Sequence, residues 1–127
     1  TIRIEALTMI EMASRQILPA TLSYVRKVAD TVASLRAADA DYSCVKEELD
    51  ELVTLTSGLK AAIDKLDQKI KEADASEGDS LSHARAYKDV IIPQMNELRA
   101  VADRLETIVD ASLWPIPTYG DLLFGVI

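Results

Sequence analysis

A long heptad pattern in the middle of the chain constrains the fold more than any other sequence feature. Apolar or small residues recur there at alternating steps of four and three, which places one apolar stripe along a helix of about 30 residues. The pattern consists of Val45, Leu49, Leu52, Thr56, Leu59, Ile63, Leu66, Ile70 and Ala73. Ser43 is the expected N-cap of this helix. Such a helix would be about 45 Å long, and its apolar stripe requires other helices to cover it.

Two further patterns of this kind flank the middle helix. The earlier one is Leu18, Thr21, Val25, Val28, Val32 and Leu35, and the residues before it are apolar on several faces, which predicts burial on more than one side. The later one is Leu81, Ala84, Lys88, Ile91, Met95, Leu98, Ala102, Leu105 and Val109, in which Tyr87 is expected to fill the gap at Lys88. Short polar connections, the second with Asp79 or Ser80 as an N-cap, join the three helices. The sequence therefore predicts an all-α fold, an antiparallel up-down-up bundle of three long helices.

Pro19 and Pro93 lie inside the first and third helical patterns. An interior proline costs about 3 kcal/mol and bends a helix, so we expect both helices to be kinked. The first and third helices of such a bundle run parallel, which would bring the two kinks side by side. The alternative is that one of the prolines starts a new helix after a break.

Charge and composition exclude several classes of function. The 127 residues carry 14 Lys and Arg against 21 Asp and Glu, a net charge of -7, so duplex nucleic acid and anionic membranes are poor partners. Hydrophobic residues make up 49% of the chain but aromatic residues only 5%, which is typical of long helices. No uncharged run reaches the roughly 18 residues of a membrane helix, and the single cysteine fits a reducing compartment. We expect a cytoplasmic protein without a signal peptide.

Residues that could support catalysis are few and scattered. His83 is the only histidine, and we favour a surface role over phosphotransfer because the residues after it lack the glycine of such motifs. Cys44 is expected to be a half-buried small residue rather than a reactive thiol. The acidic stretch 47–51 lacks the ligand spacing of a calcium loop. We therefore predict that this chain alone is not an enzyme and holds no metal or cofactor.

The amino-acid composition changes after Ser112. Two prolines forbid a helix in the stretch that follows, and Trp114, Tyr119 and Phe124 stand among apolar residues that a free tail would expose. We therefore divide the chain into a three-helix bundle, 1–112, and an extended tail of the same domain, 113–127, which must dock on the bundle or on a partner.

The tail reads LWPIPTYGDLLF over residues 113–124. It resembles the closing motif of the type III glutamine synthetases, a Trp-Pro-x-Pro-x-Tyr-x-Asp-Leu-Leu-Phe pattern. Residues 5–9 and 16–20 look like the start of that family's C-terminal helical region, and 90–103 look like its last long helix. The resemblance covers nearly the whole chain, and the middle helix is its least distinctive part.

This resemblance implies a role for the chain. The family makes glutamine from glutamate, ammonia and ATP with a divalent metal such as Mg²⁺, in double-ring oligomers, and its ligand-binding residues lie in a catalytic region that would precede Thr1. We therefore expect a non-catalytic helical domain that packs on its own catalytic region and on neighbouring subunits of a homo-oligomer. The docking candidates are Trp114, Pro115, Pro117, Tyr119, Gly120, Asp121, Leu122 and Phe124. Two alternatives stay open: the tail aromatics cover the bundle's own core, or the chain is a free-standing helical interaction module.

Overall fold

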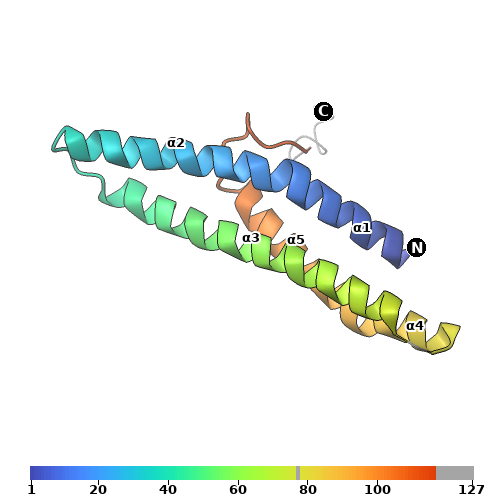
Figure 1. Cartoon of the computed structure of the whole chain (residues 1–127). Helices are drawn as coiled ribbons and strands as arrows, with labels where there is room; N and C mark the ends of the chain where they lie inside the picture. Colours follow the sequence, from blue (N-terminus) through green and yellow to red (C-terminus); the bar gives the residue numbers. More distant parts are fainter. Residues whose placement is uncertain (77, 117–127) are drawn as a thin grey trace.

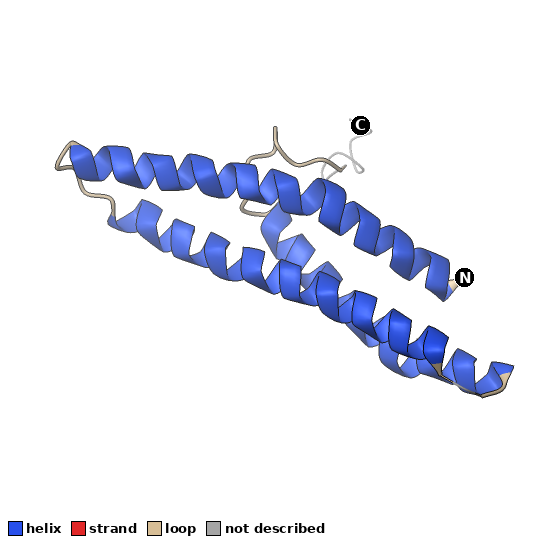
Figure 2. Cartoon of the chain, viewed as in Figure 1, coloured by secondary structure: helices blue, strands red, loops and turns tan. Residues whose placement is uncertain are grey.

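The computed structural model describes residues 1–76 and 78–116, and these residues form helices and loops without any strand (Figure 2). The all-α prediction is confirmed. Three helical rods lie along one another, and each rod runs opposite to the one before it in the chain (Figure 1). The first rod is α1 (Ile2–Met12), η1 (Ala13–Ile17) and α2 (Leu18–Ala37); the middle rod is α3 (Ser43–Ala75); the third is α4 (Ser80–Ala86), η2 (Tyr87–Ile91) and α5 (Ile92–Glu106). Within the described residues, no helix is both long and apolar enough to cross a membrane.

The core follows the predicted stripe of α3. Leu52, Leu59 and Leu66 are completely buried there. They pack in one cluster with buried residues of the flanking rods, which are Ala6, Ala13, Ile17, Val28, Ile91, Met95, Leu98 and Leu105. Tyr87 also packs against this cluster, as the pattern predicted.

The cover over α3 is incomplete at its N-terminal end. The third rod ends at Glu106, close to the point where Arg104 pairs with Glu51. Between residues 29 and 51 no side chain is buried, and the seam residues Val45 and Leu49 are only half-buried. Among the described residues, this part of the bundle is therefore a two-helix hairpin without a third layer.

The start of the first rod is less buried than its sequence suggests. The abundance of apolar residues before Pro19 predicted burial on more than one side, and this prediction is wrong. In α1 only Ala6 is buried, whereas Ile4 is 60% exposed and Leu7 and Met12 are more than a third exposed. The chain thus leaves large apolar side chains uncovered on this helix.

Both interior prolines follow a π-helical turn. The amide of Leu18 donates to the carbonyl of Ala13, five residues back, and the amide of Ile92 donates to Tyr87 in the same way. A wider turn relieves the clash between a proline ring and the carbonyl four residues earlier. The backbone stays helical through each turn, so neither proline starts a new helix after a break. That both rods are kinked at these prolines stays a prediction.

The two prolines are staggered along the bundle. Ala13 and Leu98 line the same cavity, so they lie at the same level of the first and third rods. Pro93 precedes Leu98 and is therefore level with α1, whereas Pro19 lies beyond Ala13, in α2. The expected side-by-side placement does not occur because the register of the rods is set by the core side chains.

Aspartates accept hydrogen bonds from the first turns of the second and third rods. Asp79 accepts a hydrogen bond from the amide of Ser82 at 2.8 Å, as predicted. At α3 the prediction of Ser43 as N-cap was wrong by one residue, because Ser43 is already helical and the N-cap is Tyr42, whose side chain makes no capping bond. Asp41 Oδ1 accepts from the Ser43 amide at 3.0 Å and from its hydroxyl at 2.7 Å.

Candidate functional site

The structure does not bring the candidate catalytic residues together. His83 lies on α4, where its Nε2 is 2.9 Å from the carbonyl oxygen of Ser76. Cys44 lies in the first turn of α3, at the other end of that long helix. It is exposed rather than half-buried, because the third rod does not extend to this turn. Among residues 1–76 and 78–116, no cluster of His, Cys, Asp or Glu side chains is placed to hold a metal ion.

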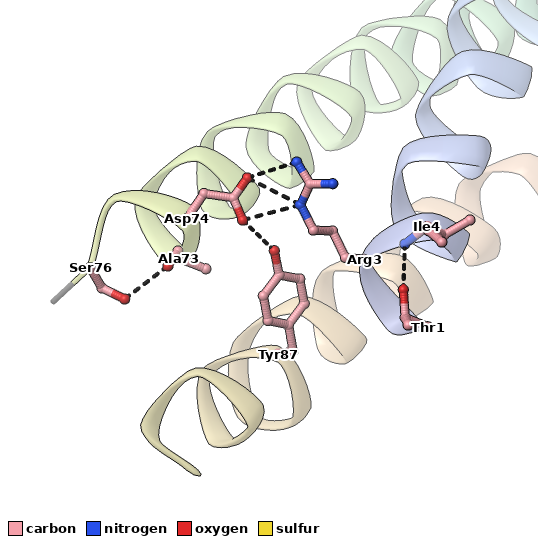
Figure 3. A network of polar contacts seen from close by, with 7 residues as sticks. All are labelled: Thr1, Arg3, Ile4, Ala73, Asp74, Ser76 and Tyr87. Atoms are coloured by element: carbon pink, nitrogen blue, oxygen red, sulfur yellow. Dashed lines mark hydrogen bonds and ion pairs between the residues drawn. The ribbon is translucent and has the colours of Figure 1, made fainter. Parts of the chain in front are cut away.

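One polar network ties all three rods together near the N-terminus (Figure 3). Arg3 of α1 donates from Nε to both carboxylate oxygens of Asp74, at 3.3 Å each, and from Nη2 to Oδ2 at 3.1 Å. The hydroxyl of Tyr87, in η2, donates to Oδ1 of the same carboxylate at 2.6 Å. Asp74 lies in the last turn of α3, so a single carboxylate joins the first, middle and third rods.

This network shifts the pKa of each partner. The hydrogen bonds from Arg3 and then Tyr87 lower the pKa of Asp74 below its ordinary value. Partial burial, together with the bond to Asp74, raises the pKa of Tyr87. Both shifts favour the pairing of an ionised carboxylate with a neutral phenol and a guanidinium. The arrangement is a structural clamp, since the guanidinium of Arg3 and the hydroxyl of Tyr87 both donate to the one carboxylate of Asp74.

Further polar contacts fix the opposite end of the third rod. Lys27 of α2 pairs with Asp110 at 3.3 Å, and the hydroxyl of Tyr24 donates to Glu48 of α3 at 3.1 Å. Burial, and then the bond to Glu48, raises the pKa of Tyr24. None of these pairs carries a sequence motif, so they could not be predicted from the sequence.

The beginning of the tail packs on the bundle itself. Trp114 is only 8% exposed and belongs to the core cluster, with Leu113 and Ile116 packed against it, while Pro115 is exposed. The indole Nε1 of Trp114 is buried and has no hydrogen-bond partner among residues 1–76 and 78–116. The other docking candidates, Pro117, Tyr119, Gly120, Asp121, Leu122 and Phe124, lie outside the described residues.

Two hollows on the surface carry apolar side chains. The α2–α3 groove, of about 570 Å³, contains no residue of the third rod and is lined by Leu18, Leu22, Thr56, Ser57, Lys60, Ala61 and Asp64. The α1–α5 cavity, of about 210 Å³, is lined by Met9, Met12, Ala13, Ile17, Leu98, Arg99, Ala102, Asp103 and Ile116. Both hollows have large apolar side chains on their walls, although four of the seven residues that line the α2–α3 groove are polar or charged. Exposed apolar surface of this kind suits contact with another segment of protein.

Two protein families and several glutamine synthetases match parts or all of the chain. Residues 1–36 match the family described as the glutamine synthetase C-terminal domain, and residues 40–113 match a domain of unknown function (DUF6468). The chain is 33% identical to a type-3 glutamine synthetase from Dictyostelium discoideum over 98% of its own length. Glutamine synthetases from Butyrivibrio fibrisolvens and Bacteroides fragilis are 28% and 26% identical over 99% and 97% of the chain.

The matched region is a small part of each relative. The chain spans 18% of the length of all three synthetases. No solved structure matches the chain. The chain therefore belongs, through its residues 40–113, to the family described as a domain of unknown function (DUF6468), and it resembles the C-terminal domain of the type III glutamine synthetases.

Proposed function

We propose that this chain is a non-catalytic packing domain of a cytoplasmic glutamine synthetase. The whole protein would join ammonia to glutamate with ATP and Mg²⁺ bound in its catalytic region. The chain would hold that region and neighbouring subunits in a homo-oligomer. Two observations support this: the chain matches the relatives over nearly all of its length, and its candidate catalytic residues lie apart.

The surface that best supports packing is the α2–α3 groove. Leu22 on its wall is 51% exposed, and Val53, one turn before Thr56 and Ser57, is 48% exposed. Small side chains at Ser57 and Ala61 leave room for another backbone or helix to approach α3 closely. Large apolar side chains next to such a groove mark a protein contact. This exposed apolar face is the single observation that carries the proposal.

The proposal is tested with Leu22→Glu in the full-length synthetase, with Leu81→Glu as the matched control. Leu81 is 58% exposed but lies on α4, away from the groove. Glutamate is a good helix former, so both substitutions should change the stability of the chain by less than about 1 kcal/mol. A charge buried in an interface is costly, so Leu22→Glu should reduce the assembly to smaller species.

Sedimentation velocity of the two variants, followed by an assay of glutamine formation, gives the result. We expect a smaller particle and lower activity for Leu22→Glu, and wild-type behaviour for Leu81→Glu. If Leu22→Glu keeps the wild-type size and activity, the groove is not a packing surface and the proposal fails.

A further inference from the structure

The third rod ends before it has covered the whole of α3. Arg104, in the last turn of α5, pairs with Glu51, so the face of α3 that carries Glu51 is turned toward the third rod. Beyond this point α2 and the first turns of α3 continue as a hairpin, residues 29–51, which we call the hairpin arm (Figure 1). Among the described residues, the seam residues of the arm are only half-buried: Val32, Leu35, Val45 and Leu49. The arm therefore keeps an apolar stripe of the kind that a third helix covers elsewhere in the bundle.

A hollow of about 280 Å³, which we call the arm groove, lies between the two helices at the place of this missing layer. Val28 and Thr31 of α2 line it, together with Val45 and Glu48 of α3. Asp110, shortly after the end of α5, is also a lining residue. The groove therefore begins where the third rod stops. A helix that lay in it would continue the third rod and pack on α2 and α3 as α5 does.

The hairpin arm carries most of the net charge of the chain. Residues 29–51 contain seven acidic residues and two basic ones, a net charge of -5, whereas the whole chain has -7. Glu47 and Glu48 stand one turn before Glu51, so the three carboxylates share one face of α3. Lys27, the basic residue of the lining, is already paired with Asp110 at 3.3 Å. The charge that the groove offers to an occupant is therefore negative.

This charge discriminates between the possible occupants. The arm of a second copy would bring another net charge of -5 to the groove, and residues 117–127 contain one aspartate and no basic residue. Like charges brought together across an interface disfavour both of these. An amphipathic helix with lysine or arginine beside its apolar stripe would cover the seam of the arm and also pair with its carboxylates.

We propose that the arm groove binds a basic amphipathic helix of a partner protein, which lies on Val28 and Val45 as a continuation of the third rod. The proposal does not rest on packing through the α2–α3 groove, because the two grooves have no lining residue in common. It gives the hairpin arm a role of its own, as a docking site for a partner helix.

Three synthetic peptides test the apolar and the charged parts of the proposal. The first has about 14 residues, or four helical turns, with leucine on one face and lysine on the others. The second has the same composition in scrambled order without an apolar face, and the third has glutamate in place of lysine. Each is titrated into the chain while the valine and leucine methyl NMR signals are followed. We expect the first peptide to shift the signals of Val28 and Val45, and to bind about tenfold more tightly than the other two.

A pair of charge-reversed variants tests where the first peptide binds. Glu47→Lys changes the face of α3 beside the groove, and Glu11→Lys is the matched control. Glu11 is exposed on α1, so both variants change the net charge of the chain by the same amount. We expect the Kd of the first peptide to rise about fivefold for Glu47→Lys and to stay within about twofold for Glu11→Lys. Circular dichroism checks that both variants keep the helix content of the wild type.

Several results would overturn the proposal. They are equal binding of the scrambled peptide, equal effects of the two lysine variants, and shifts at Leu22 of the α2–α3 groove instead of at Val28 and Val45. Absence of binding at millimolar peptide would do the same. Shifts of the Val28 and Val45 signals that depend on the concentration of the chain alone would place a second copy in the groove and would also overturn it.

Discussion

The strongest quantitative prediction concerns Trp114, because its burial decides whether the start of the tail belongs to the bundle. If Trp114 is part of the core, its replacement by alanine should destabilise the isolated chain. If it is only an anchor for a partner, the same replacement should leave the isolated chain as stable as before. The measured quantity is the free energy of unfolding of the 127-residue chain.

The structure sets the size of the effect. A buried tryptophan removes about 150–250 Å² from water, which corresponds to about 4–6 kcal/mol at 25 cal/mol per Å². Measured Trp→Ala losses are about 3–5 kcal/mol. The indole Nε1 has no partner among the described residues, so removing it offsets about 1 kcal/mol of that loss, the lower limit for a buried unpaired polar group. We therefore expect Trp114→Ala to cost about 2–4 kcal/mol. Trp114→Phe, which keeps a ring and removes the unpaired donor, should cost less than about 1 kcal/mol.

Urea unfolding followed by far-UV circular dichroism measures these differences without relying on tryptophan fluorescence. Leu81→Ala is the control, because Leu81 is 58% exposed and its truncation should change stability by less than about 0.5 kcal/mol. A loss below about 1 kcal/mol for Trp114→Ala would refute the reasoning, since removing a core tryptophan lowers the free energy of unfolding by more than this.

Three further predictions concern two glycines and the clamp at Asp74. Gly58 lies inside α3 with no atom within 4 Å of where a Cβ would stand, so Gly58→Ala should raise the free energy of unfolding by about 1 kcal/mol. Gly78→Ala should instead destabilise the chain, because Gly78 has φ of +156° and the added Cβ would lie 3.2 Å from the Cβ of Ser82. Urea unfolding checks both glycine variants: the midpoint should rise for Gly58→Ala and fall for Gly78→Ala. Shifts of the same sign would contradict these two predictions. The lowered pKa of Asp74 means that its contribution to stability is present above the ordinary value of 3.8 and is lost as the pH falls through the lower folded value. Thermal unfolding between pH 2 and 7 should therefore show a shallower acid-side loss for Asp74→Asn than for the wild type, and identical slopes would show that the clamp is not formed.

Sequence-based prediction was most accurate for α3, where the apolar residues repeat with a single heptad period. The heptad pattern identified the buried residues of α3 from Leu52 onward. A helix with one narrow apolar stripe must turn that stripe toward the helices that cover it. It could not show that Val45 and Leu49 are left half-buried. That outcome depends on where the third rod ends, which is a matter of register between rods rather than of local pattern.

The backbone conformation before the prolines and the exposure of side chains in α1 were harder to predict. A proline inside a helical pattern indicates distortion, but the choice of a π turn over a break depends on packing on both sides of Pro19 and Pro93. The exposure of Ile4 and Met12 likewise follows from the absence of a fourth helix beside α1 in the described part of the chain. The clamp at Asp74 and the two hollows had no sequence signal, because they join residues far apart in the chain.

The central claim is that this domain packs the synthetase assembly and performs no chemistry itself. The most direct measurement is the sedimentation of the full-length synthetase beside a variant that lacks these 127 residues, together with the glutamine formation of the isolated chain. We predict a smaller particle for the shortened variant and no glutamine formation by the isolated chain. An assembly of the wild-type subunit number without the domain, or turnover by the chain alone, would contradict the account.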